Sequence, residues 1–324
     1  MSLASRIDVE YNQGIHVQDS ILWLDAPRQT DLCFISHAHI HPSGPHKKIL
    51  TTEATAALLG RRIDQDKVLT SPFFRRFSLG ELDLELHPAG HMLGAAQVRI
   101  TREGSQLVYT GDFQLERSHT AGQAKILECD VLVLRATYGL PRHVFPNRQE
   151  VEAAMVAWAK RTLQNGEQPV VWAAPLGKAP ELASVFSQAG LPVRVHKSIY
   201  QVCRAYRSLG VRLVNVRCFR DSSPEGEVII FPPHLHRSKT IARLKRVRTC
   251  FASGRSLEAE DRSVDATFVL SDHADHPALL RYARESGAKK VRLTGPAAAP
   301  LSAELAAAGH DALPLQPSEQ MTLF

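Results

Sequence analysis

The feature that most constrains the fold of this chain is a set of short β-type runs, several of which end in histidine or aspartate. The first 140 residues contain runs of apolar residues that predict strands, and a periodic stretch over 52–62 that predicts a helix. The runs are SILWLDA (20–26), LCFISHAH (32–39), LDLELHPA (82–89), AQVRIT (96–101), QLVYTGD (106–112) and DVLVLRATY (130–138). This half of the chain is therefore expected to be built from sheets.

Metal-binding types of side chain gather at the ends of these runs. Alternate side chains of an extended segment point to the same side, so the three histidines of SHAHIHPSG (36–44) could converge on one cation. The stretches HPAGHMLG, VYTGDF and LSDHADHP add further imidazoles and carboxylates. The side chains concerned are His37, His39, His41, His87, His91, Asp112, Asp272, His273, Asp275 and His276. Because a scaffold commonly displays its chemistry at one edge of a sheet, the pattern indicates a metal site, and the alternative is a group of histidines that only hydrogen-bond locally.

The pattern changes at Asn147. The stretch NRQEVEAAMVAWAKRTLQNG begins with a capping pair, Asn147 and Glu150, and stops at Gly166, which predicts a helix between them. Strand and helix patterns then alternate to about residue 254, as expected of a parallel sheet with crossover helices. Residues 255–324 predict a strand, a helix and a strand before an Ala/Pro-rich tail of low information. We therefore expect a βαβ-type unit inserted between two stretches that complete each other.

The composition is that of a slightly basic globular protein. Of the 324 residues, 44% are hydrophobic and 22% are charged, which is near the average for folded domains. The formal charge of +6 fits a polyanionic partner but is also common among ordinary enzymes. The five cysteines form no CxxC pair, so neither a disulfide framework nor a zinc ribbon is indicated. No stretch reaches the ~18 apolar residues of a membrane span and no signal peptide is recognisable, so a cytoplasmic protein without a membrane partner is expected.

Missing motifs exclude several kinds of chemistry. The chain has no G-x-S-x-G elbow, which argues against a serine hydrolase of that type. It also has neither the GxxxxGK[ST] phosphate loop nor the GxGxxG fingerprint, so chemistry with a nucleotide cofactor is not expected.

The order of the motifs resembles that of a known family. SHAH, PAGHMLGAAQV, YTGDF, TYG, LGK, FASG and VLSDHADHPALL follow one another as in the metallo-β-lactamase superfamily, and within it as in the nucleic-acid-processing β-CASP branch. Over about residues 8 to 302 the chain is similar to bacterial ligase-associated DNA exonucleases, which are related to RNA 3′-end-processing nucleases. The resemblance implies an α/β protein in which an αββα sandwich, formed by 1–146 and 255–324, carries an inserted β-CASP α/β domain at 147–254.

The resemblance also implies a centre for two metal ions, usually zinc or manganese. The ligands of the first ion are matched by His37, His39, His91 and Asp112. Asp112 would bridge to the second ion, and His273 matches the histidine that faces the scissile phosphate, as general acid or phosphate ligand. Asp112 and His273 are therefore the implied catalytic residues. Such an ion lowers the pKa of a bound water towards ~7 and so supplies a nucleophile for a phosphodiester.

The chain departs from the family pattern at the second ion. Where the family has HxHxDH, this chain has His41 in place of the aspartate and Pro42 in place of the last histidine. In LTGPAAAPL, Gly295 aligns with another second-site histidine. We therefore expect one zinc or manganese ion per chain, with His41 as an alternative replacement ligand. Arg135 in LRATYG replaces an acidic residue, and its guanidinium would disfavour protonation of His273 if the two are neighbours.

Two further features predict contacts with nucleic acid. The run HRSKTIARLKRVRT (236–249) is predicted to be a helix with its apolar residues inward and its charges outward, which suits phosphates. A merely solvated basic helix is the alternative. The candidate residues are Arg243, Lys245, Arg246 and Arg248. In PLGKAPEL, Lys178 stands at a strand-to-helix turn, where its ammonium and the helix N-terminus could contact a phosphate.

These features favour a metal-dependent phosphodiesterase, namely a DNA exonuclease that acts in DNA repair. Its activity is expected to be weak if it binds one ion where the family binds two. DNA is the expected substrate and RNA the alternative, and the resemblance implies a DNA ligase or helicase as partner. The departures favour a second hypothesis, a catalytically inactive member of the family that binds DNA or a protein partner. Hydrolysis of a small ester or amide is a third hypothesis, against which the basic insertion argues.

Overall fold

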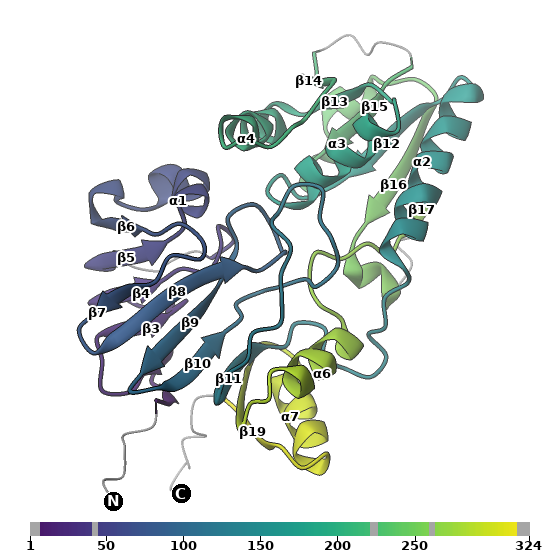
Figure 1. The fold of residues 1–324 in the computed structure, drawn as a ribbon. Coiled ribbons are helices and arrows are strands. Elements are labelled where there is room, and N and C mark those ends of the chain that lie inside the picture. Colours follow the sequence, from purple (N-terminus) through teal and green to yellow (C-terminus); the bar gives the residue numbers. More distant parts are fainter. Residues whose placement is uncertain (1–6, 41–44, 221–225, 259–262, 316–324) are drawn as a thin grey trace, which may run out of the picture. The chain divides into compact units, whose positions relative to one another are not determined.

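The computed structural model describes residues 7–40, 45–220, 226–258 and 263–315, and the chain divides into two units (Figure 1). The first unit holds the described residues of 1–117, 121–144 and 273–324, and the second holds those of 118–120 and 145–272. Within these described residues, no helix is long and apolar enough to cross a membrane.

In its described residues, the first unit contains two sheets. The strands of the first sheet lie in chain order: β1 (Val9–Tyr11), β2 (Ile15–Val17), β3 (Leu22–Leu24), β4 (Leu32–Phe34), β5 (Lys48–Thr51) and β6 (Val68–Thr70). β1, β2 and β3 pair antiparallel, whereas β3 to β6 pair parallel. The helix α1 (Glu53–Leu59) lies in the connection from β5 to β6, as parallel neighbours require a crossover.

The second sheet combines an antiparallel half with a parallel half. Its strands lie in the order β19 (Asp311–Pro314), β18 (Lys290–Thr294), β11 (Val131–Arg135), β10 (Ser105–Tyr109), β9 (Ala96–Arg102), β8 (Leu82–Pro88) and β7 (Phe77–Leu79). The strands from β19 to β10 pair parallel, and those from β10 to β7 pair antiparallel. The helices α6 (His276–Glu285) and α7 (Ala298–Ala307) pack on the parallel half (Figure 1).

The core of the first unit lies between these two sheets. On β8, Leu82, Leu84 and Leu86 alternate with less buried residues, and they join Phe34 of β4 and Tyr109 of β10 in one buried cluster. Because successive side chains of a strand point to opposite faces, this alternation dictates which face of the sheet is covered. With helices outside both sheets, the layers form an αββα sandwich, and the predicted α/β fold class is confirmed.

The second unit is built around a sheet whose described strand pairs are all parallel. Its strands lie in the order β14 (Val216–Cys218), β13 (Val193–Val195), β15 (Val228–Phe231), β12 (Gln168–Trp172), β16 (Val247–Ala252) and β17 (Ala266–Phe268). Its helices are α2 (Arg148–Gln164), α3 (Lys178–Gln188), α4 (Lys197–Ser208) and the short α5 (Lys239–Ala242). Strands and helices alternate along this part of the chain, and the sheet they form is parallel, as expected when helices serve as crossover connections.

α2 begins directly after Asn147, as the sequence predicts. The side chain of Asn147 accepts hydrogen bonds from the backbone N–H groups of Gln149 and Glu150 at 2.9 and 3.2 Å. These bonds satisfy donors that have no partner within the first turn of a helix.

The predicted helix over the basic run 236–249 is wrong. α5 ends at Ala242 and β16 begins at Val247, and between them Arg246 has a φ of +52°, which a right-handed helix does not allow. The apolar residues of this run nevertheless face inward, because Ile241, Leu244 and Val247 pack against the apolar cluster of β12 and β15. The spacing of the apolar residues indicated burial correctly but not the type of element.

The division of the chain also differs from the predicted range 147–254. β17 pairs with β16, so the second unit extends to residue 272. The Ala/Pro-rich segment that was expected to be an uninformative tail forms α7 and β19, which extend the second sheet of the first unit.

Candidate metal centre

Three histidines of the first unit lie close together. His37 and His39 follow β4, and His91 lies in the turn between β8 and β9. Their ligand atoms lie within 4.8 Å of one another, and Nδ1 of His39 is 3.0 Å from Nε2 of His91. His37 and His91 are buried, whereas His39 is partly exposed. The fold thus brings together three side chains that the sequence predicts to bind a metal.

Asp112 lies beside these histidines, just after β10. Its Oδ2 is 3.5 Å from Nε2 of His37. Its Oδ1 is 2.9 Å from Nε of Arg135 and accepts a hydrogen bond of 2.8 Å from the hydroxyl of Thr137. The carboxylate therefore presents one oxygen to the histidines and the other to a guanidinium.

Parallel strand pairing explains why Asp112 and Arg135 meet. β10 and β11 are parallel neighbours, so Asp112 after the first and Arg135 at the end of the second reach the same edge of the sheet. Arg135 is in turn opposite Thr294 of β18, and Gly295 follows directly. The ends of three neighbouring parallel strands thus supply Asp112, Arg135 and Gly295.

A buried chain of hydrogen bonds orients His37. The hydroxyl of Ser36 donates to Oδ2 of Asp25 at 2.5 Å, so it accepts a bond from Nδ1 of His37, which lies 2.8 Å away. Tyr109 donates to the same carboxylate oxygen at 2.8 Å. With its proton on Nδ1, His37 directs the lone pair of Nε2 toward the side of Asp112.

The charge states of this group suit cation binding. Burial and the neighbouring His91 lower the pKa of His37 well below its ordinary value, so the ring is neutral. Burial by itself raises the pKa of the Asp112 carboxyl, but the Arg135 guanidinium and the neighbouring histidines outweigh it and hold that pKa below its ordinary value. A neutral imidazole and an ionised carboxylate are the forms that ligate a metal.

The donor set fits one divalent cation. Zinc–nitrogen bonds of about 2.0–2.1 Å place the ligand atoms of a tetrahedral ion about 3.3 Å apart. The observed separations of 3.0 Å between His39 and His91 and of 3.5 Å between His37 and Asp112 lie on either side of that value. Imidazoles suit zinc, and a carboxylate also suits manganese. His37, His39 and His91 could therefore hold one such ion, with Asp112 beside His37 as a further candidate ligand.

A further group, His91, Asp112 and His273, also has its ligand atoms within 4.8 Å of one another, and it shares His91 with the group of three histidines. Oδ1 of Asp112 is already in contact with Arg135 and Thr137. Gly295, which aligns with a second-site histidine, has a φ of +98°, and a Cβ at this position would lie 2.9 Å from the carbonyl oxygen of Ala136. A residue with a side chain is strained there, so the local backbone does not offer a ligand.

His273 lies at the edge of this group. Its Nε2 is 3.8 Å from Oδ1 of Asp112, and its ring centre is 4.5 Å from that of His91. The backbone carbonyl of His273 accepts a hydrogen bond of 2.8 Å from the side chain of Gln114. Arg135 and His273 are therefore neighbours of the same carboxylate oxygen.

The remaining ligand-type residues named from the sequence are placed differently. His41, the alternative ligand, and Pro42 lie outside the described residues. His87 is 3.1 Å from a glutamate of β8, and His276 is 2.7 Å from a glutamate of α7. Asp275 caps the start of α6. The last three side chains have structural partners away from the histidine group.

Lys178 is not presented to an external phosphate. It is buried at the start of α3, where its Nζ donates to the carbonyl oxygen of Leu270 at 2.9 Å and lies 3.6 Å from Asp272. Its ammonium and the carboxylate of Asp272 are thus used inside the second unit. This placement argues against the predicted phosphate contact.

The four candidate charges of the basic run differ in their contacts. Arg246 donates to a backbone carbonyl at 2.8 Å, and Arg248 lies 3.1 Å from Asp265. Arg243 and Lys245 are exposed between α5 and β16. All four side chains are exposed, and Arg246 and Arg248 in addition hold partners within the second unit.

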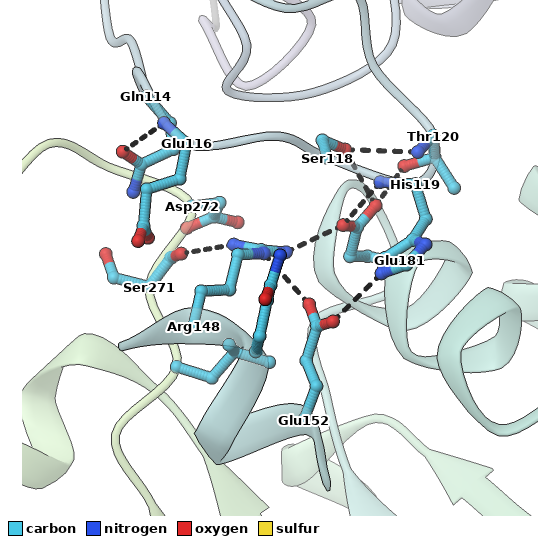
Figure 2. Close-up of polar contacts among 12 residues, drawn as sticks. Gln114, Glu116, Ser118, His119, Thr120, Arg148, Glu152, Glu181, Ser271 and Asp272 are labelled. Carbon is cyan, nitrogen blue, oxygen red and sulfur yellow. Dashed lines mark hydrogen bonds and ion pairs between the residues drawn. The ribbon is translucent and has the colours of Figure 1, made fainter. Parts of the chain in front are cut away.

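A polar cluster of the second unit was missed from the sequence (Figure 2). Glu181 of α3 accepts hydrogen bonds from Arg148 of α2 at 2.6 Å and from the backbone and hydroxyls of the segment 118–120 at 2.6–2.9 Å. Arg148 also lies 2.9 Å from Glu152, which in turn is 2.9 Å from His119. One guanidinium thus faces two carboxylates, and the hydrogen bond to Glu152 raises the pKa of His119; together these contacts fix the segment 118–120 to α2 and α3. Arg148, Glu152 and Glu181 lie in stretches that predict helix starts, but no local pattern indicates that they meet.

Known proteins of several kinds are similar to this chain. It is 31% identical over 290 residues to a probable DNA ligase of Opitutus terrae, with 88% of the chain and 28% of that protein covered. It is 25% identical over 185 residues to an RNase J-like protein of Methanocaldococcus jannaschii, with 49% of the chain and 44% of that protein covered. It is 22% identical over 289 residues to cleavage and polyadenylation specificity factor 73 of Drosophila melanogaster, with 75% of the chain and 42% of that protein covered.

These similarities cover parts of larger proteins. The chain spans less than half the length of each of the three relatives. No protein-family model matches it.

Proposed function

Because the chain belongs to the β-CASP branch of the metallo-β-lactamase superfamily, we propose that it is a metal-dependent nuclease that hydrolyses phosphodiester bonds of DNA. The observation that carries this proposal is the convergence of three imidazoles and one carboxylate at strand ends of the αββα sandwich. The similarity to a probable DNA ligase favours DNA over RNA. A role as an exonuclease in DNA repair, with a DNA ligase or helicase as partner, is added to the proposal from the resemblance of the sequence motifs alone. The RNase J-like relative makes RNA the alternative substrate.

The proposed centre holds one zinc or manganese ion on His37, His39, His91 and Asp112. Such an ion supplies Lewis acidity and lowers the pKa of a bound water towards about 7. Ser36 and Asp25 hold the neutral ring of His37 through its Nδ1, so that Nε2 stays directed toward the proposed ion. His273 holds a proton near the leaving oxygen or binds the phosphate, from its place beside Asp112.

A cleavage assay tests this proposal. Purified protein is incubated with single- and double-stranded DNA labelled at either end, with zinc, manganese or cobalt. We expect shortened products with at least one of these metals and their loss in His91→Ala. His234→Ala, which removes an exposed histidine of the second unit, is the matched control and should keep the activity. Absence of cleavage by the wild type with all three metals would contradict the proposal.

A second candidate function is nucleic-acid binding without hydrolysis. The ion pair between Arg135 and Asp112 favours it, because it occupies the carboxylate oxygen that the second ion of a two-ion centre would use. Retained DNA binding together with no cleavage in the same assay would support this candidate over the nuclease.

A further inference from the structure

The two oxygens of Asp112 face different cations or cation sites. Oδ2 faces His37 and thus the proposed ion, whereas Oδ1 is 2.9 Å from Nε of Arg135. The hydroxyl of Thr137 donates to Oδ1 at 2.8 Å and completes the contacts on this side. A guanidinium therefore stands where a carboxylate that bridges two ions would meet the second one.

The charge of Arg135 is permanent in this environment. An arginine in a protein is not deprotonated. One positive charge is thus fixed beside the proposed ion, independent of pH and of metal supply.

The side chain of Arg135 is partly accessible to another anion. A guanidinium carries five N–H donors in a planar fork. Among the described residues, Asp112 is the one group with which the Arg135 side chain forms an ion pair, and this side chain keeps 29% of its surface exposed. His273, whose Nε2 is 3.8 Å from the same carboxylate oxygen, is also partly exposed. Two nitrogen-bearing side chains therefore flank one oxygen of Asp112 and remain accessible.

We propose that Arg135 binds a phosphate group of the nucleic acid and takes the electrostatic place of a second divalent cation. This inference rests on the proposed function, because it assigns the phosphate to the one-ion centre of that function. Planar guanidinium donors match two oxygens of a phosphate at once, which orients the group as well as neutralising it. The residue forms hydrogen bonds only, and no covalent bond to it is made or broken.

A purely structural role for Arg135 is the competing explanation. In that case the guanidinium would serve only to neutralise the buried carboxylate of Asp112. The two explanations differ in what a lysine does at this position: an ammonium can neutralise Asp112, but it cannot offer the planar fork to a phosphate.

The test is equilibrium binding of thymidine 5′-monophosphate to the manganese-loaded protein, measured by calorimetry. We expect Arg135→Met to weaken binding about 10- to 100-fold and Arg135→Lys to lie between this variant and the wild type. Arg76→Met is the matched control, because it removes an arginine that is also paired with an aspartate, at 2.5 Å from Asp83, and should bind as the wild type does. Metal content is measured on each variant, and nucleotide affinities are compared between samples that carry the same amount of manganese per chain.

Wild-type affinity in Arg135→Met would overturn the inference. If Arg135→Met does not fold, Arg135→Lys decides, and wild-type affinity in this folded variant overturns the inference equally. A wild-type protein that does not bind the nucleotide would also overturn the inference. Nucleotide binding that depends on Arg135 in a protein that cleaves no DNA would remove the proposed nuclease and leave the phosphate site standing.

Discussion

At the scale of single residues, the two oxygens of Asp112 have different electrostatic neighbours. Oδ2 faces the neutral ring of His37, and Oδ1 faces the guanidinium of Arg135. The guanidinium keeps the carboxylate ionised, so that it can contribute a negative charge to an ion on the histidine side. The same contact occupies the other oxygen, and this is the basis on which we propose a single ion.

Asp25→Asn should weaken metal binding although Asp25 does not reach the ion. Both oxygens of this carboxylate accept hydrogen bonds from Ser36, and one of them also accepts a hydrogen bond from Tyr109. An amide at this position would point its N–H groups at these donors, so Ser36 would no longer be held in the orientation that fixes the ring of His37. Loss of such an outer partner typically costs about 10- to 100-fold in metal affinity. Competition with a chromophoric chelator measures the change. Asp311→Asn, at an aspartate 3.0 Å from Arg292, is the control, and equal affinities of both variants would contradict the proposed role of Asp25.

Gly295→Ala should be more costly than an ordinary glycine replacement. Both Gly295 and Gly309 have φ above +90°, so alanine is strained at either position, at a cost of about 1–3 kcal/mol. At Gly295 the added Cβ also meets the carbonyl oxygen of Ala136 at 2.9 Å, whereas at Gly309 it meets nothing within 4 Å. We expect a further loss of about 1–3 kcal/mol in the free energy of unfolding for Gly295→Ala, measured by urea denaturation. Equal losses in the two variants would show that a side chain at 295 is tolerated.

At the scale of elements, the Arg148–Glu181 pair holds the second unit together at the start of α2 and α3. Glu181→Ala leaves the buried guanidinium of Arg148 without this partner and breaks the bonds to the segment 118–120. Removing one partner of a buried pair typically costs about 3–5 kcal/mol. Hydrogen exchange of peptides from α2 and α3 under increasing urea measures the loss. Glu150→Ala, at an exposed glutamate of α2, should change it little, and similar exchange in both variants would refute the anchoring role.

Elements were predictable where local chemistry decided them. Asn147 and the following apolar period predicted α2 because the cap and the buried face are both local properties. The basic run misled because Ile241, Leu244 and Val247 have a helical spacing, while the left-handed backbone of Arg246 separates a short helix from a strand. β17 was assigned to the wrong part of the chain because its pairing with β16 is a tertiary contact that no local pattern records.

At the scale of the whole molecule, the residue types of the candidate site could be predicted but not their electrostatic partners. His37, His39, His91 and Asp112 are among the ligand-type residues that stand at or near the ends of β-type runs, and the resemblance to the family singles them out from the others. The contact of Arg135 with Asp112 depends on the parallel pairing of β10 with β11, which the sequence does not state. The bond between Tyr109 and Asp25 joins residues 84 positions apart, and only the packing of the two sheets brings them together.

The net charge of +6 is expected to act on DNA through Arg243 and Lys245. These two side chains are exposed, and Arg246 and Arg248, although also exposed, are engaged in contacts within the second unit. We expect the double variant Arg243→Ala/Lys245→Ala to weaken DNA binding and to lower the slope of log K against log salt by about 0.9 for each lost phosphate contact. Fluorescence anisotropy at several salt concentrations measures both. Arg248→Ala is the comparison, and an unchanged slope in the double variant would mean that these charges are only solvated.

The most direct test of the central claim is the number of metal ions per chain. Protein is loaded with excess zinc or manganese, freed of unbound metal and analysed by inductively coupled plasma mass spectrometry. The arrangement of His37, His39, His91 and Asp112, with Arg135 on the far oxygen of the carboxylate, predicts one ion per wild-type chain and none in His91→Ala. Two ions per wild-type chain, or an ion retained in His91→Ala, would contradict it.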